Sequence, residues 1–150
     1  RLRDQELILR FFAMRHDGSA YFRPLKGFLN QFMKSNRHFE RFSGETLSDE
    51  FRATVSTIRR VLGDRPFRPE RLLNAAILDS VMSAVSKMID GNVAIDDNTL
   101  RSRYDTLIAN DDYMAATKRN TAQEEQVERR LRLAQQILGG IELPVDGSKQ

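Results

Sequence analysis

The chain has 150 residues, of which 40% are hydrophobic and 30% are charged, and its formal net charge at pH 7 is +3. This length and composition are typical of one folded domain and exclude an intrinsically disordered chain. The absence of cysteine excludes disulfides, cysteine-ligated zinc and thiol chemistry. No run reaches the roughly 18 apolar residues that a membrane span requires, so we expect a cytoplasmic protein without a membrane partner.

The charge is unevenly distributed along the chain. Residues 1–45 carry nine Lys and Arg against five Asp and Glu, whereas residues 91–150 carry eight against ten. The excess of cations near the N-terminus is compatible with a nucleic-acid-binding face, although a mixed, solvated surface would have the same composition.

Apolar residues recur with helical spacing in successive segments, and no segment shows the alternation of a strand. The first helix is predicted from Asp4, a good N-cap residue, to Gly18. The second covers residues 24–36, the third begins at Ser48 and ends at Gly63, and the fourth covers residues 70–89.

The fifth helix is predicted over residues 97–109, and "NDDYMAAT" is expected to form one short helical turn or two. Thr121 and Glu124 have the spacing of a capping box, which would begin a last helix that ends at Leu138. The sequence therefore predicts one all-α domain, residues 1–140, with five or six helices, short loops and a flexible extended tail over residues 141–150. Its expected core comprises Leu7, Phe11, Phe28, Phe32, Val55, Ile58, Ile77, Leu78, Val81, Leu131 and Ile137.

No catalytic or metal-binding motif is recognisable. His16 and His38 lack the spacing of metal ligands, and no glycine-rich phosphate loop is present. The acidic pairs at residues 96–97, 111–112 and 124–125 fall at predicted helix starts, where carboxylates are favoured by the helix dipole alone. We predict no catalytic residue, metal site or cofactor, and expect this chain by itself to hydrolyse no nucleotide and to cleave no DNA.

The stretch "YFRPLKGFLNQFMKSNRHFERF" interleaves cations with aromatic residues. Aromatic rings beside cationic groups are a common means of holding single-stranded nucleic acid. Phe28 and Phe32 fall on the apolar stripe of their predicted helix, however, and this favours core packing over base stacking. The interleaved residues are Arg23, Lys26, Lys34, Arg37 and Arg41 with Phe22, Phe28, Phe32, Phe39 and Phe42.

A second basic stretch, "RRVLGDRPFRPER", contains two prolines that prevent a continuous helix. It places five arginines around one loop that is expected to be exposed. The planar guanidinium group suits phosphate or carboxylate, so the loop is a candidate DNA contact, and an inter-domain salt-bridge surface would have the same composition. The candidate residues are Arg59, Arg60, Arg65, Arg68 and Arg71.

Four stretches, "RLRDQELILRFFAMR", "YFRPLKGFLNQFM", "FRPERLLNAAILDSVMSA" and "YMAATKRNTAQEEQVERRLRLAQ", together resemble a prokaryotic family in the same order. The family is typified by the N-terminal domain of GmrSD-type modification-dependent restriction enzymes, catalogued as a domain of unknown function. The resemblance covers most of the chain and corresponds to the helical C-terminal portion of that domain.

In that family a ParB/sulfiredoxin-like α/β part precedes the helical part and carries an Asp-Gly-Gln-Gln-Arg-type motif associated with nucleotide hydrolysis. No such motif continues the Asp-Gly pairs at residues 17, 90 and 146 of this chain. The resemblance therefore implies a non-catalytic helical companion domain of a DNA-related or phage-defence protein, whose parent would be an NTPase or NTP-dependent nuclease. The alternative is a stand-alone helical module that binds protein and has no nucleic-acid role.

The first predicted helix carries charges of both signs beside a wide apolar surface. We expect Arg3, Asp4, Glu6 and Arg10 to form a polar seam with the upstream α/β domain that the resemblance implies. Arg10 would be held by Glu6 from its own helix and by a group from that domain, because an unpaired buried charge costs several kcal/mol.

Overall fold

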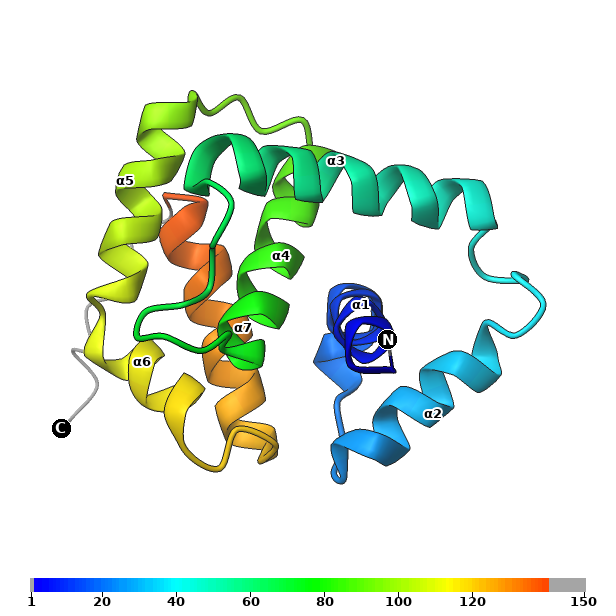
Figure 1. Cartoon of the computed structure of the whole chain (residues 1–150). Coiled ribbons are helices and arrows are strands. Elements are labelled where there is room, and N and C mark those ends of the chain that lie inside the picture. Colours follow the sequence, from blue (N-terminus) through cyan, green and yellow to red (C-terminus); the bar gives the residue numbers. More distant parts are fainter. Residues whose placement is uncertain (1, 141–150) are drawn as a thin grey trace, which may run out of the picture.

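The computed structural model describes residues 2–140, in which every regular element is helical (Figure 1). The predicted all-α single domain is confirmed, with seven α-helices in the described residues where the sequence predicted five or six. The predicted tail, residues 141–150, lies outside the described residues. The elements are α1 (Leu2–Asp17), the 3-10 turn η1 (Gly18–Ala20), α2 (Leu25–Ser35), α3 (Gly44–Leu62), α4 (Ala75–Asp90), α5 (Asp97–Ile108), α6 (Asp111–Lys118) and α7 (Glu124–Leu138).

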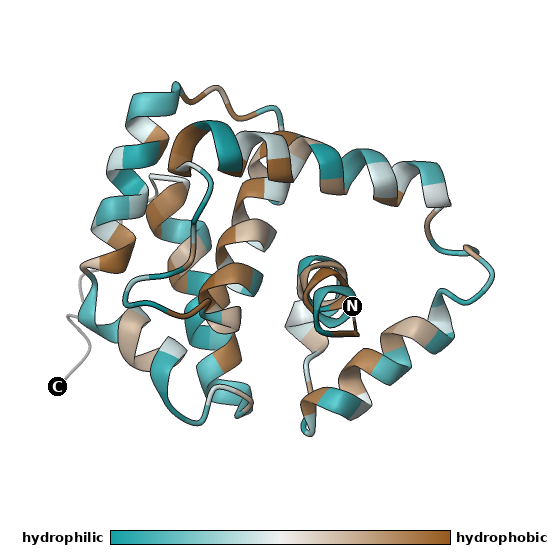
Figure 2. Ribbon diagram, viewed as in Figure 1, coloured by the Kyte–Doolittle hydropathy of each residue, from teal (hydrophilic) through white to brown (hydrophobic). Residues whose placement is uncertain are grey.

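Helix α4 is the centre of the main core. It packs against α1, α3, α6 and α7, and every residue from Ala76 to Ser86 is buried. Such a helix must be covered on all sides, because apolar surface that remains in water costs roughly 25 cal/mol per Å². Figure 2 shows the hydrophobic colour concentrated on α4 and the hydrophilic colour on the outer helix α5.

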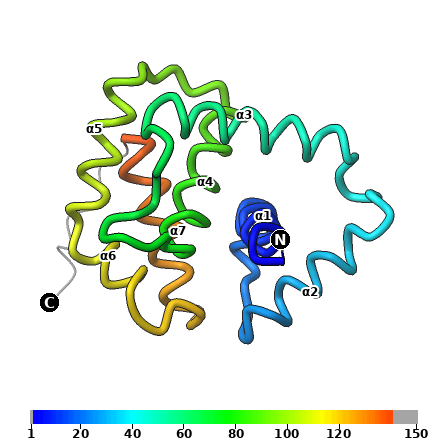
Figure 3. The backbone as a smooth tube through the Cα atoms, in the orientation of Figure 1, coloured from blue at the N-terminus to red at the C-terminus, as the bar shows by residue number. Residues whose placement is uncertain are grey.

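A second, smaller apolar cluster joins α1 to α2 and α7. It consists of Ala13, Met14, Phe28, Leu29, Phe32 and Val127. Helix α2 and the connection that follows it lie at the edge of the molecule, on the side of α1 away from α4 (Figure 3). One side of α2 is therefore buried against α1, and its opposite side faces outward.

Several helix boundaries differ from the predicted ones because other side chains cap the helices. Helix α3 begins four residues before Ser48, since the Ser43 hydroxyl accepts a hydrogen bond from the Thr46 N–H at 3.0 Å. Helix α4 begins at Ala75 rather than residue 70, since the Asn74 side chain accepts hydrogen bonds from the first free N–H groups of the helix. Helix α1 begins before Asp4, which lies in its first turn.

The predicted capping box at the start of α7 is wrong. The residue before the helix is Gln123, whose side chain makes no capping hydrogen bond. Thr121 instead turns its carbonyl oxygen toward Arg130, whose Nη1 donates to it at 2.6 Å. The end of the helix at Leu138 agrees with the prediction.

Most of the predicted core is confirmed, and Val55 is wrong. Leu7, Leu131 and Ile137 are half-buried against the core clusters, whereas Val55 is 37% exposed. Val55 lines an apolar cleft of about 320 Å³, together with Ile58 and other residues of α3, α4 and the connection between α3 and α4. Thr54 and Ile58 are buried next to Val55, which lies at the margin of the buried side of α3 and faces the cleft.

Candidate functional site

The five predicted arginines lie on the last turn of α3 and on the connection between α3 and α4, residues 63–74 (Figure 1). Helix α3 ends at Leu62, and the residue after it, Gly63, has a φ of 83° that is accessible to glycine at little cost. Phe67, only 3% exposed, anchors the middle of the connection. The Asn74 N–H donates to the Phe67 carbonyl oxygen at 2.8 Å, which closes the loop onto the start of α4.

Two of the five arginines are already neutralised within the chain. The Arg59 Nε lies 2.9 Å from the Asp64 carboxylate. Arg60 donates from Nε and Nη2 to the Asp97 carboxylate at 2.8 and 3.2 Å, a bidentate pair. These two side chains link the end of α3 to the loop and to α5, so they are poorly placed to bind an external anion.

The other three arginines, Arg65, Arg68 and Arg71, are exposed. Within residues 2–140, none of the three has an ion-pair partner in the structure. Arg65 and Arg68 line a cleft of about 340 Å³ between the loop and α5, whose wall includes Tyr104 and the ion pair of Arg101 with Asp105. The structure therefore brings Arg65 and Arg68 together and separates them from the neutralised pair on α3.

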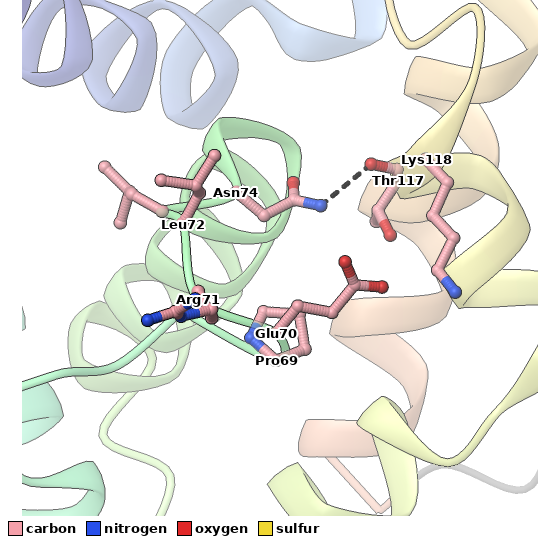
Figure 4. A pocket seen from close by; sticks show the side chains of 8 residues that line it. Pro69, Glu70, Arg71, Leu72, Asn74, Thr117 and Lys118 are labelled. Carbon is pink, nitrogen blue, oxygen red and sulfur yellow. Dashed lines mark hydrogen bonds between the residues drawn. The ribbon is translucent and has the colours of Figure 1, made fainter.

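Arg71 lies beside a different and larger cleft, of about 960 Å³, between the loop and the end of α6 (Figure 4). Figure 4 shows the Glu70 carboxylate directed toward the α6 end, where Lys118 lies, and the Arg71 guanidinium directed away from it. The Asn74 side chain donates to the Thr117 carbonyl oxygen at 2.9 Å, which fixes the floor of this cleft. Like the cleft beside Arg68, this cleft is lined by charges of both signs.

The four residues of the predicted polar seam fall into two groups that differ in burial. Arg3, Asp4 and Glu6 are exposed on the first turns of α1, whereas Arg10 is buried. The Arg10 Nη2 lies 2.9 Å from Asp79 Oδ2 of α4. The partner of Arg10 is therefore Asp79 rather than the expected Glu6, and Arg10 does not depend on another domain for its counter-charge.

Asp79 is the centre of a buried cluster that the sequence did not predict as a site. Arg130 of α7 donates to both Asp79 oxygens, from Nε at 3.0 Å and from Nη2 at 2.9 Å. Asp79 is 0% exposed and Arg130 is 1% exposed. We call Arg10, Asp79 and Arg130 the buried clasp, because they join α1, α4 and α7. The one signal in the sequence was an aspartate inside the most apolar helix.

A second buried polar contact lies next to the clasp. The Ser80 and Tyr113 hydroxyl groups are 2.6 Å apart, and burial raises the pKa of Tyr113 far above its usual range. The tyrosine therefore stays protonated and can serve as a hydrogen-bond donor. Both hydroxyl groups are buried, so they contribute to helix packing rather than to chemistry on a substrate.

The described residues hold no group of three or more His, Asp or Glu that could bind a metal ion. His16 makes a single polar contact, with its Nε2 3.0 Å from the Glu50 carboxylate, and its ring packs 4.2 Å from that of Phe42. Between residues 2 and 140 no helix combines the length and hydrophobicity needed to cross a membrane.

The ion pair between Arg41 and Asp17 makes the free energy of unfolding depend on pH. Arg41 donates to both Asp17 oxygens at 2.8 and 2.7 Å, and these hydrogen bonds hold the pKa of Asp17 below its ordinary value of 3.8. A lowered carboxyl pKa stabilises the folded state above the unfolded pKa, and this stabilisation is lost as the pH falls through the folded value.

We expect Asp17→Asn to lower the free energy of unfolding at pH 7, and this effect to diminish as the pH falls below 3.8 through the lowered pKa of Asp17. Urea denaturation of both proteins at several pH values measures this difference. Asp64→Asn is the control, because its pair with Arg59 is 78% exposed on the aspartate side and exposed pairs contribute little. A difference between wild type and Asp17→Asn that stays constant from pH 7 to pH 2 would contradict the assignment.

Comparison of the chain with protein-family models, curated proteins and solved structures finds no match.

Proposed function

We propose that this chain is a non-catalytic helical domain that contacts DNA phosphates through the loop between α3 and α4. The observation that carries the proposal is the state of Arg65, Arg68 and Arg71, which are exposed and without an ion-pair partner in residues 2–140. A folded protein usually pairs or disperses such charges, and guanidinium groups are well suited to phosphate oxygens. Arg59 and Arg60 have a supporting role, because Asp64 and Asp97 neutralise them.

The parent protein in this proposal is of the GmrSD-like kind, with a ParB/sulfiredoxin-like domain as the partner. Arg3, Asp4 and Glu6 lie on the exposed first turns of α1, next to Leu2 and Ile8, two exposed large apolar side chains. Such a mixture of charged and apolar side chains is typical of surfaces between domains. The proposed inter-domain surface consists of these five residues. It excludes Arg10, which is buried against Asp79.

The test is binding of a short labelled DNA duplex, followed by fluorescence anisotropy at several salt concentrations. We expect Arg65→Gln/Arg68→Gln to weaken binding and to reduce the slope of log K against log salt by about 1.8, since each phosphate contact contributes about 0.9. This double variant should unfold at the same denaturant concentration as the wild type.

The control is Arg52→Gln/Arg119→Gln, which removes two exposed arginines from α3 and from the end of α6. It makes the same change in net charge and should leave the salt slope unchanged. Equal losses in the two double variants would mean that net charge alone drives binding, and this result would contradict the proposed contact.

The alternative, a protein-binding module, is favoured by one observation. Leu72 is 82% exposed and lies beside the cleft of about 960 Å³ in Figure 4. An exposed leucine next to a cleft is a suitable anchor for a partner protein. If Leu72→Ser abolishes retention of a partner in pull-downs and the chain retains no nucleic acid, the alternative replaces the DNA proposal.

A further inference from the structure

Residues 18–39 contain no Asp or Glu, although the whole chain has 21 acidic residues. This segment includes all of α2 and carries four cations, Arg23, Lys26, Lys34 and Arg37. Arg23 is paired, with its Nε 2.7 Å from Glu124. The other three are exposed, and in the described part of the chain no carboxylate pairs with them.

The packing of α2 places its cations on one ridge. Phe28, Leu29 and Phe32 are buried, and the small cluster packs them against α1. On the opposite side Lys26, Asn30 and Lys34 follow one another at intervals of four residues, and all three are exposed. Side chains at this spacing lie one above another along a helix, and the rise of 1.5 Å per residue separates the two lysines by about 12 Å.

One exposed aromatic residue precedes α2 in the chain and another follows it. Phe22 is 42% exposed, and its ring packs edge-on against Phe28 with 5.7 Å between ring centroids. A Cβ atom on Gly27 would lie 3.6 Å from Phe22 Cε2, so the ring lies alongside the first turn of α2. After the helix, Phe39 is 58% exposed and lies two residues beyond the exposed Arg37. Its ring lies near the start of α3, since a Cβ atom on Gly44 would be 3.7 Å from Phe39 Cε1.

We propose that this surface, formed by Phe22, Lys26, Asn30, Lys34, Arg37 and Phe39, binds single-stranded nucleic acid. The lysines and Arg37 would contact phosphates, and the two phenylalanine rings would stack on unpaired bases. A wholly apolar partner does not fit, because the centre of the ridge is Lys-Asn-Lys. A duplex does not fit either, because the faces of paired bases are covered by their neighbours in the stack.

This surface is separate from the arginine loop. In Figure 1 the loop between α3 and α4 lies on one side of α1 and helix α2 lies on the other. The proposal therefore does not rest on the duplex contact of Arg65 and Arg68, and the two can be tested in the same protein. The variant Arg65→Gln/Arg68→Gln should retain the single-strand binding described here.

The first experiment measures the binding of a fluorescein-labelled 20-nucleotide oligo(dT) by anisotropy at several salt concentrations. Lys26→Gln/Lys34→Gln should reduce the salt slope by about 1.4, since single strands contribute about 0.7 for each phosphate contact. The charge-matched control, Arg52→Gln/Arg119→Gln, should leave the slope unchanged. Equal effects of the two double variants would overturn the proposal.

The second experiment uses the absence of tryptophan from the chain. Phe22→Trp introduces a single fluorophore at the proposed stacking position, and oligo(dT) should quench its emission in a saturable manner. Val93→Trp, at a position that is 49% exposed in the connection between α4 and α5 and outside both proposed binding surfaces, should not be quenched. Absence of quenching at Phe22→Trp under conditions where anisotropy shows binding would overturn the stacking assignment.

Two competitors identify the class of ligand. A blunt DNA duplex should leave the Phe22→Trp emission unchanged, and polyglutamate should not displace oligo(dT) at equal charge concentration. Displacement by polyglutamate without quenching by oligo(dT) would show an acidic protein segment as the occupant and would overturn the nucleic-acid proposal.

Discussion

Asp79→Asn is expected to lower the free energy of unfolding by about 3–5 kcal/mol, because it leaves two buried guanidinium groups without a counter-charge. The Arg130 side chain is 1% exposed and donates to both Asp79 oxygens. Arg10 donates to Asp79 Oδ2 at 2.9 Å from the opposite helix. Asparagine retains the shape of the side chain, so the loss measures charge and hydrogen bonding rather than packing. Urea denaturation followed by circular dichroism is the measurement.

The matched variants separate the contributions within the buried clasp. Arg10→Met should cost less than Asp79→Asn, because Asp79 keeps its bidentate contact with Arg130. The triple variant Asp79→Leu/Arg10→Met/Arg130→Met should recover much of the loss, since apolar residues of similar volume can replace a buried ion cluster. A loss below about 1 kcal/mol for Asp79→Asn would show that the clasp contributes little to stability.

Phe11→Ala is expected to lower the free energy of unfolding by about 3–5 kcal/mol, the range for removing a large buried aromatic side chain. Phe11 is fully buried in the main core. Its ring lies 5.0 Å from that of Phe12 and 6.3 Å from that of Phe51, between centroids. Loss of the ring leaves a cavity between α1, α3 and α4 that the neighbouring helices can only partly close.

The control is Phe39→Ala, which removes the same side chain from a position that is 58% exposed. Its effect on unfolding should be within about 0.5 kcal/mol of zero, as is usual for surface substitutions. Comparable losses at the two positions would contradict the placement of α1 against the main core.

Local patterns were sufficient to predict the fold class and most of the helices. Phe28 and Phe32 follow the 3.6-residue period of α2, and Ile77 and Val81 follow that of α4, so their burial could be read from spacing. Helix starts were predicted less well. Residues 70–74 include Leu72 and Leu73 and were therefore predicted as helical. The Asn74 side chain instead accepts hydrogen bonds from the first N–H groups of α4, so the helix begins at Ala75.

The buried clasp could not be predicted, because its members are 69 and 51 residues apart in the sequence. No local spacing rule relates Arg10, Asp79 and Arg130 to one another. The same holds for the arginine loop, where only the structure distinguishes paired Arg60 from unpaired Arg68. Sequence alone could identify cations and acids but not which of them neutralise each other.

The placement of α1 between helices from later parts of the chain also has a consequence during translation. Arg10 precedes Asp79 by 69 residues, and Asp79 precedes Arg130 by 51. At 5–20 residues per second, the ribosome completes this interval in roughly 6–24 s. Throughout that time the apolar side of α1, with Phe11, has no α7 to complete its surroundings. The apolar side of α1 can therefore complete its native packing only after α7 has been synthesised.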